Sequence, residues 1–299
     1  MSNLILFIAG PTAVGKSDVA LKVVKQIGGE IVSCDAMQVY KEVSIASNKP
    51  SKEDRSVCPH HLIDVASVYG EFDVHQYVRL ATEVINKIIA NGKVPVVVGG
   101  SGMYLEALVD GVFEGPKADE QLRVQLHKQA EDEGSESLHK ELQEVDKFAA
   151  DKIHLNDVRR IIRALEVFRL TAKPISQWQK ERVGFAKTHD LRLFVLNQER
   201  DVLYEKINER VDSMFNQGLE EEVHSLDIKR VSKTASCIIG LRETYDYIKG
   251  KVSKEDALTL MKQNTRHYAK RQLTWFRRDK RFVWINKDTQ DAVSVILDQ

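Results

Sequence analysis

Residues 10–17 read GPTAVGKS, which matches the phosphate-loop pattern G-x-x-x-x-G-K-[ST]. The apolar run LILFI at 4–8 is typical of a buried parallel strand, and helically spaced apolar residues follow the loop. Glycines let the loop N–H groups turn inward, and the N-terminus of the next helix adds partial positive charge. The sequence therefore predicts a strand–loop–helix unit that binds a diphosphate or triphosphate.

Two side chains of this loop have specific predicted roles. Lys16 is placed to neutralise phosphate oxygens, and the Ser17 hydroxyl is predicted to be a ligand of Mg²⁺. The predicted diphosphate-binding residues are Gly10, Pro11, Thr12, Ala13, Val14, Gly15, Lys16 and Ser17. The loop does not identify the molecule that carries the phosphates, so binding of ATP stays open.

The remaining periodicity extends this unit into an α/β fold. Strands are predicted at 4–8, 30–33, 94–98, 191–196 and 281–285, and helices from 17 to 27 and from 75 to 91. Residues 117–187 show no strand pattern and are predicted to be helical. We expect a P-loop NTPase-like core with a parallel sheet over 1–116 and 188–299, and an inserted helical domain over 117–187 that contacts RNA.

Charge is segregated along the chain, although 44 Lys and Arg balance 44 Asp and Glu. Residues 147–187 hold ten basic and four acidic side chains, and residues 262–281 hold eight basic and one acidic. The second run includes Tyr268, Trp275 and Phe276. Basic side chains contact backbone phosphates and aromatic rings stack on unpaired bases, so both segments are candidate RNA surfaces. The alternative is solvated helix faces with aromatic rings packed inward.

Several other classes of protein are disfavoured. The apolar runs are too short to span a membrane, and the first basic residue is Lys16, which argues against a secretory signal. The three cysteines are widely spaced, so we expect neither a disulfide framework nor a zinc site. His60 and His61 are expected to be structural. We expect a cytoplasmic protein that acts as a monomer.

One feature of phosphate-loop enzymes is missing. Such enzymes usually have a carboxylate after a core strand to help hold Mg²⁺, but Gly99 and Gly100 follow the predicted strand 94–98. The best-placed carboxylate is Asp35, which follows the strand 30–33 at the edge of the sheet where ligands bind. Asp35 is either a general base facing the bound phosphates or a residue that caps its own loop.

Six blocks of the chain together resemble the family of tRNA dimethylallyltransferases, also called tRNA isopentenyltransferases. They are GPTAVGKS at 10–17, SCDAMQVYKE at 33–42, PHHLIDV at 59–65, VVGGSGMYLEAL at 97–108, NDVRRIIRALEV at 156–167 and KRQLTWFR at 270–277. The resemblance implies transfer of a dimethylallyl group from dimethylallyl diphosphate to the exocyclic amine of an adenosine. That adenosine lies just 3′ of the anticodon, so the implied partner is the anticodon arm of tRNA.

The resemblance also implies roles for individual residues. It makes Asp35 the catalytic base and Arg210 the diphosphate-binding arginine, beside Lys16. The tRNA contacts that it implies are Asp35, Ala36, Met37, Gln38, Ser101, Arg123, Arg159, Arg160, Ile161, Ile162, Arg163, Cys237, Ile238, Ile239, Gly240, Leu241 and Arg242. The family usually has Thr at 101 and Tyr at 241, and no counterpart of the eukaryotic zinc finger is found, so a bacterial-type enzyme is expected.

Three other functions stay open on the residues alone. A small-molecule kinase would use the loop for ATP, but it would usually have the carboxylate that is missing after residue 98. A prenyltransferase that acts on free adenine nucleotides would not need the basic segments. A non-catalytic module that binds RNA in a nucleotide-dependent manner would form no product.

Overall fold

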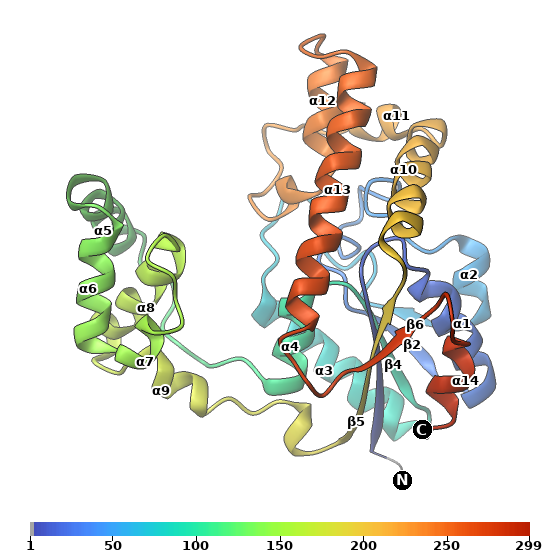
Figure 1. Cartoon of the computed structure of the whole chain (residues 1–299), viewed down its shortest axis with the longest axis horizontal. Helices are drawn as coiled ribbons and strands as arrows, with labels where there is room; N and C mark the ends of the chain where they lie inside the picture. Colours follow the sequence, from blue (N-terminus) through green and yellow to red (C-terminus); the bar gives the residue numbers. More distant parts are fainter. Residues whose placement is uncertain (1–2) are drawn as a thin grey trace. The chain divides into compact units, whose positions relative to one another are not determined.

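A computed structural model describes residues 3–299. Within these residues, one six-stranded parallel sheet has the strand order β3-β2-β4-β1-β5-β6 (Figure 1). The strands are β1 Leu4–Ala9, β2 Glu30–Ser33, β3 His60–His61, β4 Pro95–Gly99, β5 Asp190–Asn197 and β6 Val283–Asn286. The predicted α/β fold with a parallel sheet is confirmed. The sequence did not predict β3, because two residues are too few to show an alternating pattern.

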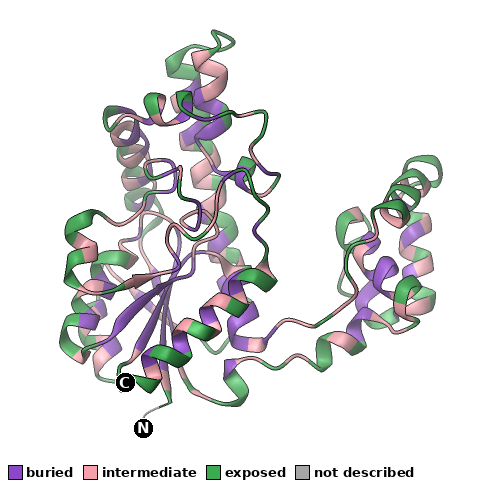
Figure 2. Ribbon diagram, turned by 180° about the vertical axis from the view of Figure 1, so that it is seen from behind, coloured by how far each residue is buried: buried purple, intermediate pink, exposed green. Residues whose placement is uncertain are grey.

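The strands are apolar on both sides because both faces of the sheet are covered. Ile5 and Phe7 of β1 belong to one core cluster, whereas Leu6 and Ile8 belong to another on the opposite face. Such double burial gives a strand a continuous apolar run instead of alternation. Figure 2 shows the inner strands of the sheet as buried along most of their length.

The helices of this unit lie on the two faces and beyond the carboxyl edge of the sheet (Figure 1). They are α1 Lys16–Ile27, α2 Lys52–Val57, α3 Val74–Ala90, α4 Gly102–Asp110, α10 Arg200–Asn216, α11 Leu219–His224, α12 Leu241–Ile248, α13 Lys254–Phe276 and α14 Ala292–Leu297. The core cluster with Ile5 packs against α3 and α4, and the cluster with Leu6 packs against α1 and α14. Helices α10 and α13 contact each other.

Two compact units divide the chain. The first comprises Met1–Val109 and Phe185–Gln299, and the second comprises Asp110–Gly184. The sequence predicted an insertion over 117–187, so the second unit begins seven residues earlier and ends three residues earlier than this expectation. Its helices are α5 Glu120–Glu133, α6 Ser135–Val145, α7 Lys147–Ala150, α8 Val158–Thr171 and α9 Ile175–Lys180.

The second unit has a hydrophobic core of its own. Leu126, Leu138, Leu142 and Leu165 are all fully buried within it. Helix α8 contributes the largest share, since its apolar positions follow the helical period. In the part of the chain that the structure describes, no helix combines the length and apolar character needed to cross a membrane.

Candidate functional site

The phosphate loop adopts the conformation that its glycines permit. Gly10 has φ 149° and Gly15 has φ 84°, a region that L-residues with side chains rarely adopt. A Cβ atom on Gly10 would lie 2.7 Å from the carbonyl oxygen of Leu196, so only glycine fits. Gly15 caps α1, and Lys16 is the first residue of that helix. The loop therefore places unpaired N–H groups of a helix N-terminus at the carboxyl end of β1.

Lys16 lies with its ammonium group at this loop. Its Nζ donates a hydrogen bond to the carbonyl oxygen of Pro11 at 2.8 Å. Burial lowers the pKa of Lys16 from 10.5 to about 8; nearby Asp35 opposes this shift, and the positive charge of Arg210 adds to it. A bound diphosphate would supply negative charge next to this ammonium group and would favour its protonated form.

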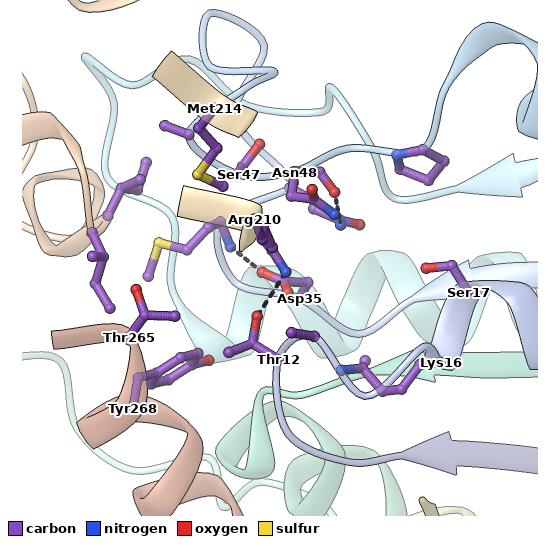
Figure 3. A pocket seen from close by; sticks show the side chains of 18 of the residues that line it. Thr12, Lys16, Ser17, Asp35, Ser47, Asn48, Arg210, Met214, Thr265 and Tyr268 are labelled. Carbon is purple, nitrogen blue, oxygen red and sulfur yellow. Dashed lines mark hydrogen bonds between the residues drawn. The ribbon is translucent and has the colours of Figure 1, made fainter. Parts of the chain in front are cut away.

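Arg210 reaches the same loop from α10. Its Nη1 donates a hydrogen bond to Thr12 Oγ1 at 2.8 Å. Burial lowers the pKa of Arg210 and the carboxylate of Asp35 raises it, which places these two charges near each other. Figure 3 shows Thr12, Asp35 and Arg210 turned toward one another, with Lys16 beside them. The structure thus brings together Lys16, Asp35 and Arg210, which are the three residues predicted to be catalytic.

Asp35 begins the loop that follows β2. Its Oδ1 accepts the N–H of Met37 at 2.9 Å, so the side chain does cap its own loop. Asp35 also lines the cavity described below, and its role as a general base stays a prediction. The rest of this loop is held by Ser101, whose Oγ accepts the N–H of Ala36 at 2.9 Å. Gln38 Nε2 donates to the carbonyl oxygen of Asn48 at 3.0 Å.

These residues line a cavity of about 720 Å³ in the first unit. Of the residues predicted from the sequence, it is lined by Thr12, Ala13, Gly15, Lys16, Ser17, Asp35, Met37, Gln38, Arg210, Cys237, Ile238 and Ile239. Its wall near Arg210 also includes Val211, Met214 and Met261. A chamber with anion-binding groups at one part and apolar side chains nearby suits a ligand that joins a diphosphate to a hydrocarbon group.

Helix α13 contributes Thr265 and Gln272, which sequence reasoning missed, and Tyr268, which was predicted only as a candidate for stacking on RNA bases. Thr265, Tyr268 and Gln272 line the cavity at a spacing of three and four residues, so they share one face of the helix. These polar residues on one face of a helix that also has buried positions were the sequence signal that could have identified this part of the site. Burial raises the pKa of Tyr268 well above its usual range, and its hydroxyl lies within hydrogen-bonding reach of the Ser101 side chain.

The other aromatic residues of the 262–281 run pack inward. Phe276 is buried, and Trp275 packs against the core cluster and lies against Gly102. Of the two alternatives for this run, inward packing therefore holds for Trp275 and Phe276, and stacking of these two rings on RNA bases is corrected. The basic side chains Arg271, Arg277 and Arg278 remain exposed.

A second lysine reaches the phosphate loop from outside every predicted motif. Lys287 follows β6 and donates from Nζ to the carbonyl oxygen of Val14 at 2.9 Å. A Cβ atom on Gly15 would lie 2.6 Å from this Nζ. Its pKa is lowered by burial and by the nearby ammonium of Lys206, which lines the cavity. No sequence signal marked Lys287, since its position depends on the pairing of β6 with β5.

The basic residues predicted in the second unit divide into two groups. Arg159 and Arg160 are exposed. Arg123 and Arg163 instead converge on Glu166, which is fully buried, with N···O distances of 2.9 and 2.5 Å. These two guanidinium groups neutralise an internal carboxylate, which gives them a structural role in the unit.

Ile161 and Ile162 lie in the core of the second unit. Their exposed fractions are 0% and 3%, so their side chains do not face a partner.

The segment 237–242 of the first unit contains both exposed and buried side chains. Cys237 and Arg242 are exposed, whereas Ile238 and Leu241 are buried. Gly240 has φ 106° and begins α12.

Among residues 3–299, no group of three or more His, Cys, Asp or Glu side chains is arranged to hold a metal ion. His60 Nδ1 lies 2.9 Å from the carbonyl oxygen of Cys58, and His61 Nε2 lies 2.7 Å from Glu30 Oε2. Ser17 is exposed in the first turn of α1 and lines the cavity. A Mg²⁺ ion at this place would take most of its ligands from phosphate oxygens and water, which is the usual mode for Mg²⁺.

Comparisons with known proteins agree on one family. The IPP transferase family matches residues 38–279. A tRNA dimethylallyltransferase of Carboxydothermus hydrogenoformans is 42% identical over 297 residues, which cover 99% of this chain and 96% of that protein. One from Geobacillus thermodenitrificans is 41% identical over 301 residues, covering 100% and 95% of the two chains.

Solved structures give the same result. The tRNA isopentenylpyrophosphate transferase of Bacillus halodurans is 37% identical and has a TM-score of 0.72, with 99% of this chain and 94% of that chain covered. A eukaryotic dimethylallyltransferase acting on tRNA is 26% identical with a TM-score of 0.79. That comparison covers 99% of this chain and 78% of the eukaryotic chain.

Proposed function

The chain belongs to the tRNA dimethylallyltransferase family, and from this premise we propose that it transfers a dimethylallyl group to tRNA. The donor is dimethylallyl diphosphate, and the acceptor is the exocyclic amine of the adenosine 3′ of the anticodon. The observation that carries the proposal is the convergence of Thr12, Asp35 and Arg210 beside the phosphate loop. In support of the proposal, residues of the phosphate loop and the candidate base Asp35 line one cavity.

The leaving group sets the first requirement of the reaction. As the allylic C–O bond breaks, negative charge grows on the diphosphate, and preorganised donors lower the barrier most when they are aimed at that charge. Lys16, Arg210 and the N–H groups at the start of α1 are such donors. Bound Mg²⁺, held on the protein side by the Ser17 hydroxyl, would supply further positive charge to the diphosphate oxygens.

The acceptor amine sets the second requirement. The adenosine amine is a weak nucleophile, so the alignment of its nitrogen with the allylic carbon carries much of the rate. The new C–N bond forms as the C–O bond breaks, diphosphate leaves, and Asp35 accepts one proton from the amine. The target base is stacked in its loop and must be extruded to enter the cavity, at a cost of a few kcal/mol.

The partner is the anticodon arm of a tRNA. The exposed Arg159 and Arg160 of the second unit, and the exposed basic residues of α13, suit contacts with backbone phosphates. A cytoplasmic monomer fits a tRNA substrate and three free cysteines. A kinase and a nucleotide-switched module are not favoured, because the relatives over nearly the full chain are prenyltransferases.

One labelling experiment tests this function. The protein is incubated with Mg²⁺, dimethylallyl diphosphate labelled in the allyl group, and either tRNA or AMP. Label in tRNA at the adenosine beside the anticodon is the expected result, and label in AMP alone or in no product would refute the proposal.

The variant Asp35→Asn tests the base. An asparagine Oδ1 still accepts the Met37 N–H and so keeps the loop turn, but it cannot take the amine proton. Transfer should fall by at least about 100-fold, with tRNA affinity unchanged within about twofold. Turnover near that of the wild type would exclude Asp35 as the base.

A further inference from the structure

The amide of Gln272 lies at the end of β4, where phosphate-loop enzymes usually have a carboxylate. Strand β4 ends at Gly99, and Gln272 of α13 lies over the next residue, Gly100. Gln272 Nε2 donates to the carbonyl oxygen of Gly100 at 2.9 Å, and its Oε1 accepts the N–H of Thr12 at 2.9 Å. The side chain is 5% exposed, so both hydrogen bonds are shielded from water.

The contact between Gln272 and residue 100 requires a residue without a side chain at position 100. A Cβ atom on Gly100 would lie 2.1 Å from Gln272 Nε2 and 3.3 Å from its Cδ. Gly100 does not have a positive φ, so its backbone conformation does not by itself require glycine. The glycine therefore leaves room for the amide.

The two hydrogen bonds of Gln272 connect the two halves of the site. On one side Thr12 belongs to the phosphate loop and also accepts a hydrogen bond from Arg210. On the other side Gly100 precedes Ser101, whose N–H donates to the carbonyl oxygen of Cys34 at 3.2 Å and whose Oγ accepts the N–H of Ala36. Cys34 and Ala36 flank Asp35, so one side chain joins the anion-binding loop to the loop that carries the base.

We propose that Gln272 is a positioning residue that sets the separation between the bound diphosphate and Asp35. This inference rests on the function proposed above. The neutral amide accepts from Thr12 through its oxygen and donates to Gly100 through its nitrogen, whereas an ionised carboxylate can only accept. A carboxylate at position 272 would leave the Gly100 carbonyl without a donor and would place negative charge beside the diphosphate.

The first test is a pair of nearly isosteric variants, Gln272→Met and Gln272→Glu. A small misplacement of reacting groups can cost about 100-fold in rate, so we expect kcat to fall by about 10- to 100-fold in Gln272→Met. The KM for dimethylallyl diphosphate should change less than about threefold, because Lys16 and Arg210 still bind the anion. Gln272→Glu should be the slower variant and should also raise this KM.

A matched control is Gln26→Met, the same exchange at an exposed position of α1. It should leave kcat, KM and the melting temperature unchanged. Wild-type kcat in Gln272→Met would overturn the proposal. A loss of activity that disappears when the assay temperature is lowered well below the melting temperature of the variant would also overturn it, since that would reflect stability alone.

A second test leaves Gln272 in place. Gly100→Ala should displace the amide and lower kcat by about the same factor as Gln272→Ala, and the double variant should be no worse than either single variant. Effects that multiply in the double variant would show that the two residues act separately, which would refute the coupling.

A measurement that needs no activity separates this inference from the proposed function. The amide of Thr12 is held by Gln272 Oε1, so its hydrogen–deuterium exchange should become at least about tenfold faster in Gln272→Met. If the wild type transfers no label, the proposed function fails whatever this exchange rate is. Unchanged exchange at Thr12 would overturn the role of Gln272 even in an active enzyme.

Discussion

The lowered pKa of Lys16 predicts that diphosphate binding depends on pH in a range where most lysines do not titrate. Burial brings this pKa to about 8 in the protein without ligand. Only the protonated ammonium attracts the diphosphate. Between pH 7 and pH 9 the protonated fraction of such a group falls from about nine-tenths to about one-tenth. Affinity for dimethylallyl diphosphate should therefore fall by roughly tenfold across these two pH units.

The direction follows from linkage. The bound anion favours the charged form of Lys16 and so raises its pKa in the complex, and binding above pH 8 must take up a proton. Titration calorimetry at pH 7, 8 and 9, in two buffers with different ionisation enthalpies, measures the affinity and the proton uptake together. The second ionisation of a phosphate ester lies near pH 6, so the ligand charge is almost constant over this range.

The variant Lys16→Arg provides the control. A guanidinium stays charged at every pH of the experiment, so its affinity can be lower than that of the wild type but should not change with pH. Equal affinity of the wild type for dimethylallyl diphosphate at pH 7 and pH 9, with no proton uptake, would refute the assignment of Lys16.

Three further predictions concern other parts of the chain. Arg210→Met removes a donor aimed at the diphosphate and should lower kcat by about 100- to 1,000-fold in the transfer assay; a loss below about threefold would contradict its role. The double substitution of Arg159 and Arg160 by alanine should reduce the slope of log affinity for tRNA against log salt concentration by about two. An unchanged slope would show that neither residue contacts the tRNA phosphates.

Glu166→Leu removes the carboxylate that two guanidinium groups share and should destabilise the second unit by about 2 kcal/mol in urea unfolding, a moderate loss because both groups are about one-third exposed and can rehydrate. The pKa of Glu166 is held below 4.5 by Arg123 and Arg163 despite its burial. Its contribution is therefore present at neutral pH and lost as pH falls below 4.5. Equal stability of Glu166→Leu and the wild type at pH 7 would show that the cluster is not structural.

The phosphate loop and the class of fold were predictable because local rules decide them. The order of apolar strand, Gly10, Gly15 and helix start dictates a loop that ends at a helix N-terminus, whose N–H groups suit an anion, whatever the rest of the chain does. Asp35 was predictable for a similar reason, since the carboxyl ends of parallel strands meet at one edge of the sheet.

The environment of individual charged residues was not predictable in the same way. Arg123 and Arg163 have the same local signal as Arg159 and Arg160, namely basic side chains on helices. Arg163 lies three residues before Glu166 on α8, which is a local spacing, but only packing buries this carboxylate and brings Arg123 of α5 to it.

The sequence by itself determined the phosphate loop and the place of Asp35 directly after a core strand, because each depends on residues close together in the chain. Six blocks spread over residues 10–277 identified the family. Tertiary structure alone decided how the site is held together. Gln272 and Lys287 reach the phosphate loop across separations of 260 and 273 residues, which no local pattern encodes. Their hydrogen bonds exist because α13 brings Gln272 to Thr12 and Gly100 and because β6 pairs with β5, and these tertiary contacts hold the phosphate loop in place.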